Sequence, residues 1–130
     1  MRYAETDQMG VVHHRNYLVW CELGRTEHFR KLGASYSELE RSGVVLAVAE
    51  ANVRYAAPAR YDDRIRVDTR VSAVGSRGVT FEYTIYRADD GVRLASARTT
   101  LVALDRSGRV ITLPSHVRQA LARDLAPAPA

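Results

Sequence analysis

The 130-residue chain is predicted to be one α+β domain, with a long helix packed on one face of a curled antiparallel sheet. Two observations predict this class. Apolar residues recur at intervals of three and four over residues 16–32, as on one face of a helix. After residue 43, apolar and polar residues alternate in several runs that are separated by short turns. Without repeats or linkers, we expect a single domain at residues 1–125 and a disordered Ala/Pro tail at 126–130.

The first half of the chain is predicted to form a short strand at residues 1–5, a loop at 6–14 and the long helix at 16–32. Gly33 is typical of the position just after a helix end. The apolar face of the helix is expected to consist of Tyr17, Trp20, Cys21, Gly24, His28, Phe29 and Leu32. The charged residues Arg25, Glu27, Arg30 and Lys31 are expected to cover much of its remaining surface.

The second half is predicted to be a meander of strands after a short helical turn at residues 35–42. The expected strands are 44–55, 65–71, 79–85 and 92–104, with a short further strand at 110–111. Turns are indicated at 62–63, 75–78, 89–91 and 105–108. A last helix is expected to start at Pro114 and to bury Val117, Ala120 and Leu121.

Composition excludes several classes of function. The net charge of +4 comes almost entirely from arginines that are scattered among acidic residues, which is typical of solvated faces rather than of a nucleic-acid surface. Cys21 is the only cysteine, so no internal disulfide can form. The sequence shows no signal peptide and no apolar run of membrane-spanning length. We therefore expect a cytoplasmic protein that binds no nucleic acid and spans no membrane.

The predicted sheet has one face that the helix does not cover and edge strands without partners. A single helix cannot cover both faces of four or five long strands, and several outward-facing strand residues are apolar or aromatic. Long unprotected edge strands also tend to pair with another chain. We therefore expect a homodimer or a homotetramer made of two dimers.

The loop before the long helix carries the chemistry that the sequence offers. It places the carboxylate of Asp7, the turn-forming Gly10 and the imidazoles of His13 and His14 beside a helix start. Such a carboxylate can attack a carbonyl while backbone N–H groups at the helix N-terminus stabilise the oxyanion. Taken alone, Asp7 is better explained as a turn residue. Two adjacent imidazoles rarely point the same way, so no metal site is expected.

This loop resembles the signature of hotdog-fold acyl-CoA thioesterases of the 4-hydroxybenzoyl-CoA thioesterase type, including the Tol-Pal-associated subgroup. The matching residues are Tyr3, Glu5, Thr6, Asp7, Met9, Gly10, Val11, Val12, His14, Asn16 and Tyr17, with support from 53–63 and 101–105. The resemblance spans residues 3 to about 121. It implies a hotdog fold, in which a sheet of five or six strands wraps round the long helix. It also implies hydrolysis of an acyl-CoA thioester without a metal or a separate cofactor, since coenzyme A is part of the substrate.

The resemblance also implies roles for individual residues. Asp7 becomes the catalytic carboxylate, acting either as nucleophile or as general base on water. His14 becomes the residue whose backbone N–H polarises the carbonyl, with Gly10 shaping the turn; a role for the His14 side chain remains an alternative. Pocket depth is expected to depend on Met9, Val12 and Tyr17. Candidate ligands of the coenzyme A phosphates are Arg54, Arg60, Ser76 and Arg77.

Two other activities remain open alternatives. A hotdog dehydratase or isomerase would need a catalytic His or Glu in a different motif, and the sequence offers none. A non-catalytic acyl-CoA-binding module would keep the pocket but would not need Asp7. Cys21 falls on the apolar helix face and is expected to be a core residue rather than a nucleophile. The sequence therefore favours a short- to medium-chain or aromatic acyl-CoA thioesterase.

Overall fold

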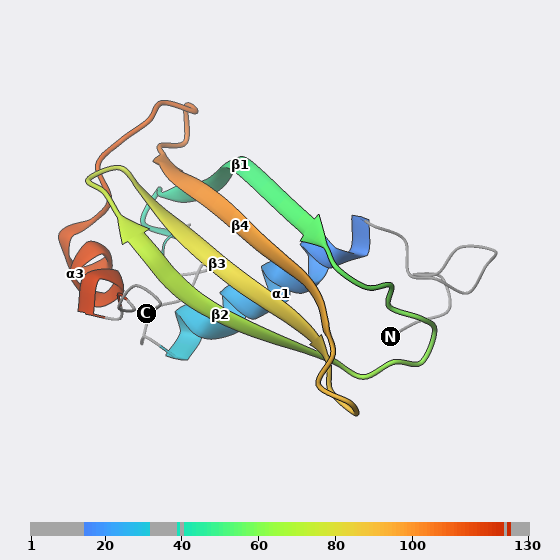
Figure 1. The fold of residues 1–130 in the computed structure, drawn as a ribbon. Helices are drawn as coiled ribbons and strands as arrows, with labels where there is room; N and C mark the ends of the chain where they lie inside the picture. The colour runs from blue at the N-terminus through green and yellow to red at the C-terminus, as the bar shows by residue number, and fades with distance from the viewer. Residues whose placement is uncertain (1–14, 32–38, 40, 124, 126–130) are drawn as a thin grey trace.

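A four-stranded antiparallel sheet with strand order β1-β4-β3-β2 is the scaffold of the molecule (Figure 1). The structure is a computed structural model, and it describes residues 15–31, 39, 41–123 and 125. Its elements are α1 (Arg15–Lys31), β1 (Val45–Tyr55), β2 (Ile65–Val74), β3 (Gly78–Arg87), β4 (Arg93–Leu104) and α3 (Ser115–Arg123).

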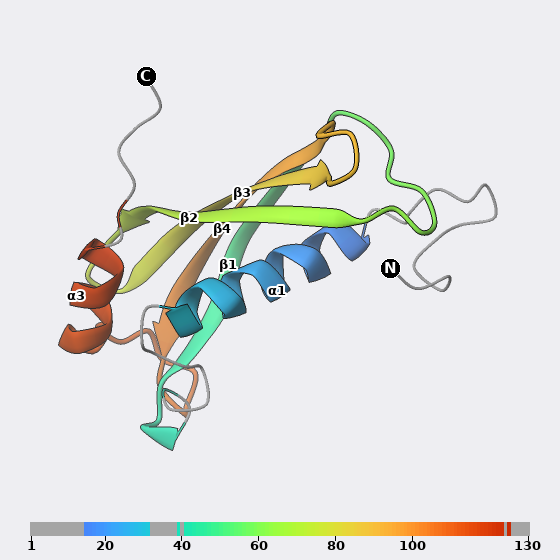
Figure 2. The same ribbon diagram turned by 90° about the horizontal axis from the view of Figure 1, so that it is seen from below.

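Helix α1 lies along one face of the curved sheet, and α3 packs at the end where β2 finishes (Figure 2). The apolar stripe of α1 contributes four buried residues to the core: Tyr17, Trp20, Cys21 and Phe29. The facing strand β3 has the alternation that the sequence predicts: Val79, Phe81, Tyr83 and Ile85 are buried beneath the helix, and the residues between them turn to the other face.

The helix-free face of the sheet is mostly polar. Thr80, Glu82 and Thr84 of β3 lie there, and Arg70 of β2 forms an ion pair with Glu82 at 3.0 Å. One solvated face is common in antiparallel sheets, so this face needs no second layer. Exposed apolar side chains gather instead on α1 and β1. Several apolar or aromatic residues do lie on this face, as expected, among them Tyr86 and Val102. The exposed apolar residues of α1 and β1 add to the expectation of a dimer.

The predicted boundaries agree closely with the structure. Helix α1 begins at Arg15, one residue before the expected start, and α3 begins directly after Pro114 with Val117 and Leu121 buried. The expected strand at 110–111 is reduced to a single bridge between Leu104 and Val110. The expected strand at 1–5, the loop at 6–14, most of the turn at 35–42 and the tail at 126–130 lie outside the described residues. Four of the five or six expected strands are thus in the described part of the chain.

Candidate active site

The first turn of α1 is fixed to the sheet by Tyr17. The phenol oxygen of Tyr17 accepts a hydrogen bond from the backbone N–H of Ala59 at 3.1 Å. Its ring packs edge-on against Tyr55 at the end of β1, with centroids 5.0 Å apart, and against Trp20 at 4.9 Å. Burial raises the pKa of the Tyr17 hydroxyl, which therefore stays protonated at neutral pH. The start of the helix is held in a defined position relative to β1.

The loop residues Asp7, Met9, Gly10, Val12 and His14 lie outside the described residues, so their roles stay predictions. Their place in the chain is nevertheless informative. Helix α1 begins at the residue after position 14. The first N–H groups of an α-helix have no partner within the helix, and the helix dipole makes this end positive. In the sequence, the predicted oxyanion donor His14 directly precedes this helix, so its role as a donor stays a prediction.

A groove of about 200 Å³ runs between α1 and the edge strand β1. Leu18, Val19, Val48 and Ala51 form apolar walls, and Glu22 also lines the groove. Arg25 and Thr99 complete its lining, and both are buried residues. The groove thus combines apolar walls with a polar floor.

The floor is organised by a buried arginine. Arg25 is only 7% exposed, and its Nη1 donates a hydrogen bond to the hydroxyl of Tyr83 at 3.0 Å. That hydroxyl also shares a hydrogen bond with Thr99 at 2.6 Å. Burial raises the pKa of Tyr83, although the hydrogen bonds from Thr99 and Arg25 oppose this. The Tyr83 hydroxyl is therefore a neutral link between the arginine and strand β4.

The burial of Arg25 was missed by the sequence analysis, which placed it among the residues covering the solvent side of the helix. That expectation is wrong. Cys21, Arg25 and Phe29 follow one another at intervals of four, and all three are buried in one row along α1. The signal was available, because Arg25 stands between two residues of the predicted apolar face. An arginine can occupy such a place when its stem packs on apolar surface and its head finds an acceptor.

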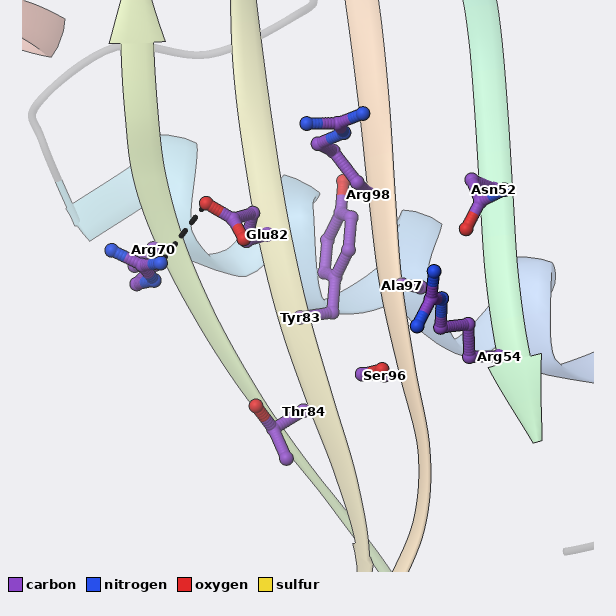
Figure 3. Close-up of a pocket in the computed structure, with 9 residues that line it drawn as sticks. All are labelled: Asn52, Arg54, Arg70, Glu82, Tyr83, Thr84, Ser96, Ala97 and Arg98. Carbon is purple, nitrogen blue, oxygen red and sulfur yellow. Dashed lines mark hydrogen bonds and ion pairs between the residues drawn. The ribbon is translucent and has the colours of Figure 1, made fainter. Parts of the chain in front are cut away.

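A second depression, of about 400 Å³, lies on the helix-free face of the sheet (Figure 3). Arg54 of β1 and Arg98 of β4 rise from neighbouring strands on this face, beside the Arg70–Glu82 ion pair (Figure 3). The depression is also lined by Asn52, Tyr83, Thr84, Ser96 and Ala97. The site is polar and open, which suits an anionic group better than an acyl chain.

The structure separates the predicted coenzyme A ligands into two groups. Arg54 lines the depression, and Arg60 lies in the loop after β1, where its backbone N–H donates to Asp63 at 2.8 Å. Ser76 and Arg77 form the turn between β2 and β3, at the opposite end of the sheet. The register puts Arg54 level with Thr84 of β3, six residues from Gly78 at the turn, or about 20 Å at 3.3 Å per residue. Within one chain, the two groups cannot hold the same phosphate.

Cys21 is a buried core residue, as predicted. Its side chain is fully buried, and burial raises the pKa of the thiol to about 12. A protonated thiol is a poor nucleophile. Within the described ranges, no three His, Cys, Asp or Glu side chains gather as metal ligands would. Neither described helix has the length and apolar character needed to cross a membrane.

Comparison with known proteins agrees with this arrangement. A family model described as the thioesterase-like superfamily matches residues 1–121. The candidate acyl-CoA thioesterase YneP of Bacillus subtilis is 43% identical over 86 residues, which are 66% of this chain and 62% of YneP. The chloroplastic acyl-acyl carrier protein thioesterase ATL2 of Arabidopsis thaliana is 36% identical over 118 residues, which are 91% of this chain and 63% of ATL2. The chain thus spans less than two thirds of the length of these curated relatives.

A solved structure extends the likeness to three dimensions. The DHNA-CoA thioesterase of Staphylococcus aureus superimposes with a TM-score of 0.90 at 30% identity, over 95% of this chain and 85% of that one. Together with the helix-on-sheet arrangement, this likeness confirms the predicted hotdog fold. Because the family model covers nearly the whole sequence, the chain belongs to the thioesterase-like superfamily.

Proposed function

We propose that this protein hydrolyses the thioester of an acyl-CoA substrate to a free acid and coenzyme A. The observation that carries the proposal is the family match over residues 1–121, which includes the loop with Asp7. It is supported by a helix that begins directly after this loop and is anchored through Tyr17. Two relatives are named as an acyl-CoA thioesterase and an acyl-acyl carrier protein thioesterase, and both names describe hydrolysis of a thioester bond.

The chemistry is assigned to the loop and the helix start. The Asp7 carboxylate either attacks the thioester carbonyl to form a mixed anhydride, which water then hydrolyses, or takes a proton from the attacking water. The backbone N–H of His14 donates to the carbonyl oxygen as negative charge develops on it. The carbon–sulfur bond breaks, and coenzyme A leaves as a thiolate. Because a thiol has a pKa near 8.5, this leaving group needs little help from an acid.

The active unit is proposed to be a homodimer joined through β1. This strand has 11 residues, and within the described part of the chain it pairs with β4 alone, at the edge of the sheet. Large apolar side chains are exposed here, among them Val48 of the strand at 50% and Val19 of the facing α1 at 43%. An exposed apolar edge strand is a template for pairing with an identical strand. A second copy would bury these side chains and cover the α1–β1 groove.

Finer points of the assignment also stay proposals. They are membership of the 4-hydroxybenzoyl-CoA type or its Tol-Pal-associated subgroup, a pairing of dimers into tetramers, the cytoplasmic location and the absence of a cofactor. Binding of the coenzyme A nucleotide by Arg54, Arg60, Ser76 and Arg77 belongs with them. The two groups lie at opposite ends of the sheet in one chain, so each is assigned to a different part of the nucleotide or to a different subunit.

A substrate panel tests the proposal. Purified protein is mixed with acetyl-, butyryl-, octanoyl-, benzoyl- and 4-hydroxybenzoyl-CoA and with an octanoyl-acyl carrier protein, and free thiol is followed with a chromogenic thiol reagent. We expect thiol release from at least one acyl-CoA. Thiol release from octanoyl-acyl carrier protein but from no acyl-CoA would mean that the substrate is an acyl carrier protein thioester rather than an acyl-CoA. Tight binding of an acyl-CoA without any release would favour a non-catalytic binding module.

A further inference from the structure

We propose that Arg54 of β1 and Arg98 of β4 form a binding site for a phosphate group on the helix-free face of the sheet. The site is the depression of about 400 Å³ on that face, and it does not depend on the proposed thioesterase activity. It is separate from the α1–β1 groove, because successive residues of a strand point to opposite faces of a sheet. Arg98 lines the depression, whereas the next residue, Thr99, lines the groove on the helix side.

The register of the strands brings the two arginines together. Arg98 lies opposite Asn52 of β1, and Arg54 lies two residues further along β1, opposite Ser96. Arg54 and Arg98 are therefore diagonal neighbours on adjacent strands, roughly 7–8 Å apart and within reach of long side chains. Figure 3 shows the guanidinium of Arg54 reaching from β1 toward β4, the strand that carries Arg98. A ligand that lies over β4 can contact both guanidiniums.

The charge of the depression is not balanced by the protein. Its lining contains three guanidiniums, those of Arg54, Arg70 and Arg98, but a single carboxylate, that of Glu82. Arg70 holds this carboxylate in an ion pair at 3.0 Å. Neither Arg54 nor Arg98 forms an ion pair or a side-chain hydrogen bond with the part of the chain that the structure describes. The lining therefore carries two positive charges in excess, and these repel one another unless an anion lies between them.

A phosphate group matches this lining in charge and in geometry. A phosphate monoester carries about −1.5 to −2 charges at pH 7 and has three acceptor oxygens, whereas a carboxylate would neutralise only one of the two excess charges. The planar fork of a guanidinium donates to two such oxygens at once. The hydroxyls of Thr84 and Ser96 and the amide of Asn52 also line the depression and can donate to the remaining oxygens.

Two small anions test the site in the wild-type protein. Phenyl phosphate and phenyl sulfate have nearly the same shape, but above pH 6 the phosphate carries one more negative charge. In a ¹H–¹⁵N NMR titration at pH 7.5, we expect phenyl phosphate to bind about tenfold more tightly. It should shift the backbone amides of Arg54 and of residues 96–98, and leave the turn at residues 75–78 unchanged. Equal affinity for the two anions, or shifts confined to that turn, would overturn the inference.

Substitutions test the two arginines themselves. Arg54→Gln and Arg98→Gln should each weaken the binding of phenyl phosphate about tenfold or more, because each removes charge-assisted hydrogen bonds. Arg98→Lys should fall between Arg98→Gln and the wild type, since it keeps the charge but loses the fork. Arg93→Gln is the matched control, because Arg93 is an exposed arginine at the start of the same strand and does not line the depression. An equal loss in Arg93→Gln would mean diffuse attraction to a basic surface and would contradict the site.

Free coenzyme A then identifies the source of the phosphate. If saturating coenzyme A abolishes the phenyl phosphate shifts at residues 96–98, the site belongs to the phosphates of coenzyme A, whose nucleotide would reach round the β1 edge. If both compounds bind together, the site belongs to a separate phosphate compound that acts from the far face of the sheet. Both outcomes support the phosphate site, whereas absence of phenyl phosphate binding by the wild-type protein would defeat it. Absence of thiol release from every thioester would defeat the proposed function alone.

Discussion

Cys21 illustrates how the surroundings of one side chain decide its chemistry. It is the only thiol of the chain, it is fully buried on α1, and burial raises its pKa to about 12. At neutral pH it therefore carries its proton and cannot attack a thioester. Cys21 is therefore not the proposed nucleophile, and that role stays proposed for the Asp7 carboxylate.

We expect Cys21 in the native protein to resist thiol reagents. Incubation with a chromogenic disulfide reagent at pH 7.5 should release less than about 0.1 equivalent in an hour, because reaction requires both exposure and a thiolate. One equivalent should react in 6 M guanidinium chloride, which serves as the control. Rapid reaction of the native protein would mean that the helix face is open to solvent.

Alkaline pH should destabilise the fold through the same thiol. The folded pKa is about 12 against an ordinary value of 9.0, so above pH 9 the unfolded chain loses the proton while the folded chain keeps it. The free energy of unfolding should then fall by up to about 1.4 kcal/mol per pH unit. Urea unfolding at pH 8, 9 and 10 measures the fall, and Cys21→Ala should make it shallower. Equal slopes for the two proteins would refute this.

The sequence allowed some site residues to be predicted and not others, for physical reasons. Tyr17 and Cys21 belong to an apolar helical stripe, and their burial follows from its spacing. Arg25 is buried because Tyr83 and Thr99, more than 50 residues away in the chain, provide its polar surroundings. The place of Arg25 between Cys21 and Phe29 indicates its burial, but no local pattern shows which distant residues surround its head group.

At the scale of elements, the contact between α1 and β2 depends on a residue without a side chain. A Cβ atom at Gly24 would lie 2.7 Å from the hydroxyl of Thr69 and 3.0 Å from a methyl group of Val67. Both of these side chains are β-branched and cannot easily turn away. Gly24 therefore allows the helix to approach the strand closely, at the expense of helix propensity.

We expect Gly24→Ala to lower the free energy of unfolding by about 1 kcal/mol, because the clash outweighs the gain in helix propensity. Urea denaturation of the single variant and of the variant that also carries Thr69→Ala measures this. The second substitution removes the nearest atom, so Gly24→Ala should cost little or nothing in that background. An equal cost in both backgrounds would show that the contact with Thr69 is not the cause.

The elements themselves were largely predictable. Alternation and Gly/Asp turns located the strands, because each strand has one buried and one solvated face. Residues 110–111 form only a bridge, since two apolar residues between turns do not reveal whether a neighbouring strand has room to pair with them. That depends on the tertiary arrangement around Leu104.

At the scale of the whole molecule, β1 stands at an edge of the described sheet. Among the described residues it pairs with β4 alone, and its exposed Val48 lies beside exposed residues of α1. The sequence predicted a dimer from long edge strands and outward-facing apolar residues, and the exposed apolar residues of β1 support the proposal that this edge forms the interface. Pairing of two β1 strands would join the two sheets and close both grooves.

We expect light scattering after size-exclusion chromatography to give at least twice the chain mass of 14.5 kDa. Val48→Lys should shift the protein toward the monomer, because charged side chains on an edge strand disfavour pairing. Val110→Lys is the control, since Val110 is similarly exposed at 53% but lies outside β1. A wild-type monomer, or an equal effect of both variants, would argue against the β1 interface.

The most direct test of the account is the turnover of Asp7→Asn with the best acyl-CoA of the panel. Asparagine keeps the size of the side chain but can neither attack the carbonyl nor take a proton from water, so we expect kcat to fall by a factor of roughly 10³ or more with the melting temperature unchanged. Asp68→Asn is the matched control, because Asp68 forms an exposed ion pair with Arg66 on the helix-free face of the sheet. Turnover near the wild-type value in Asp7→Asn would contradict the central claim.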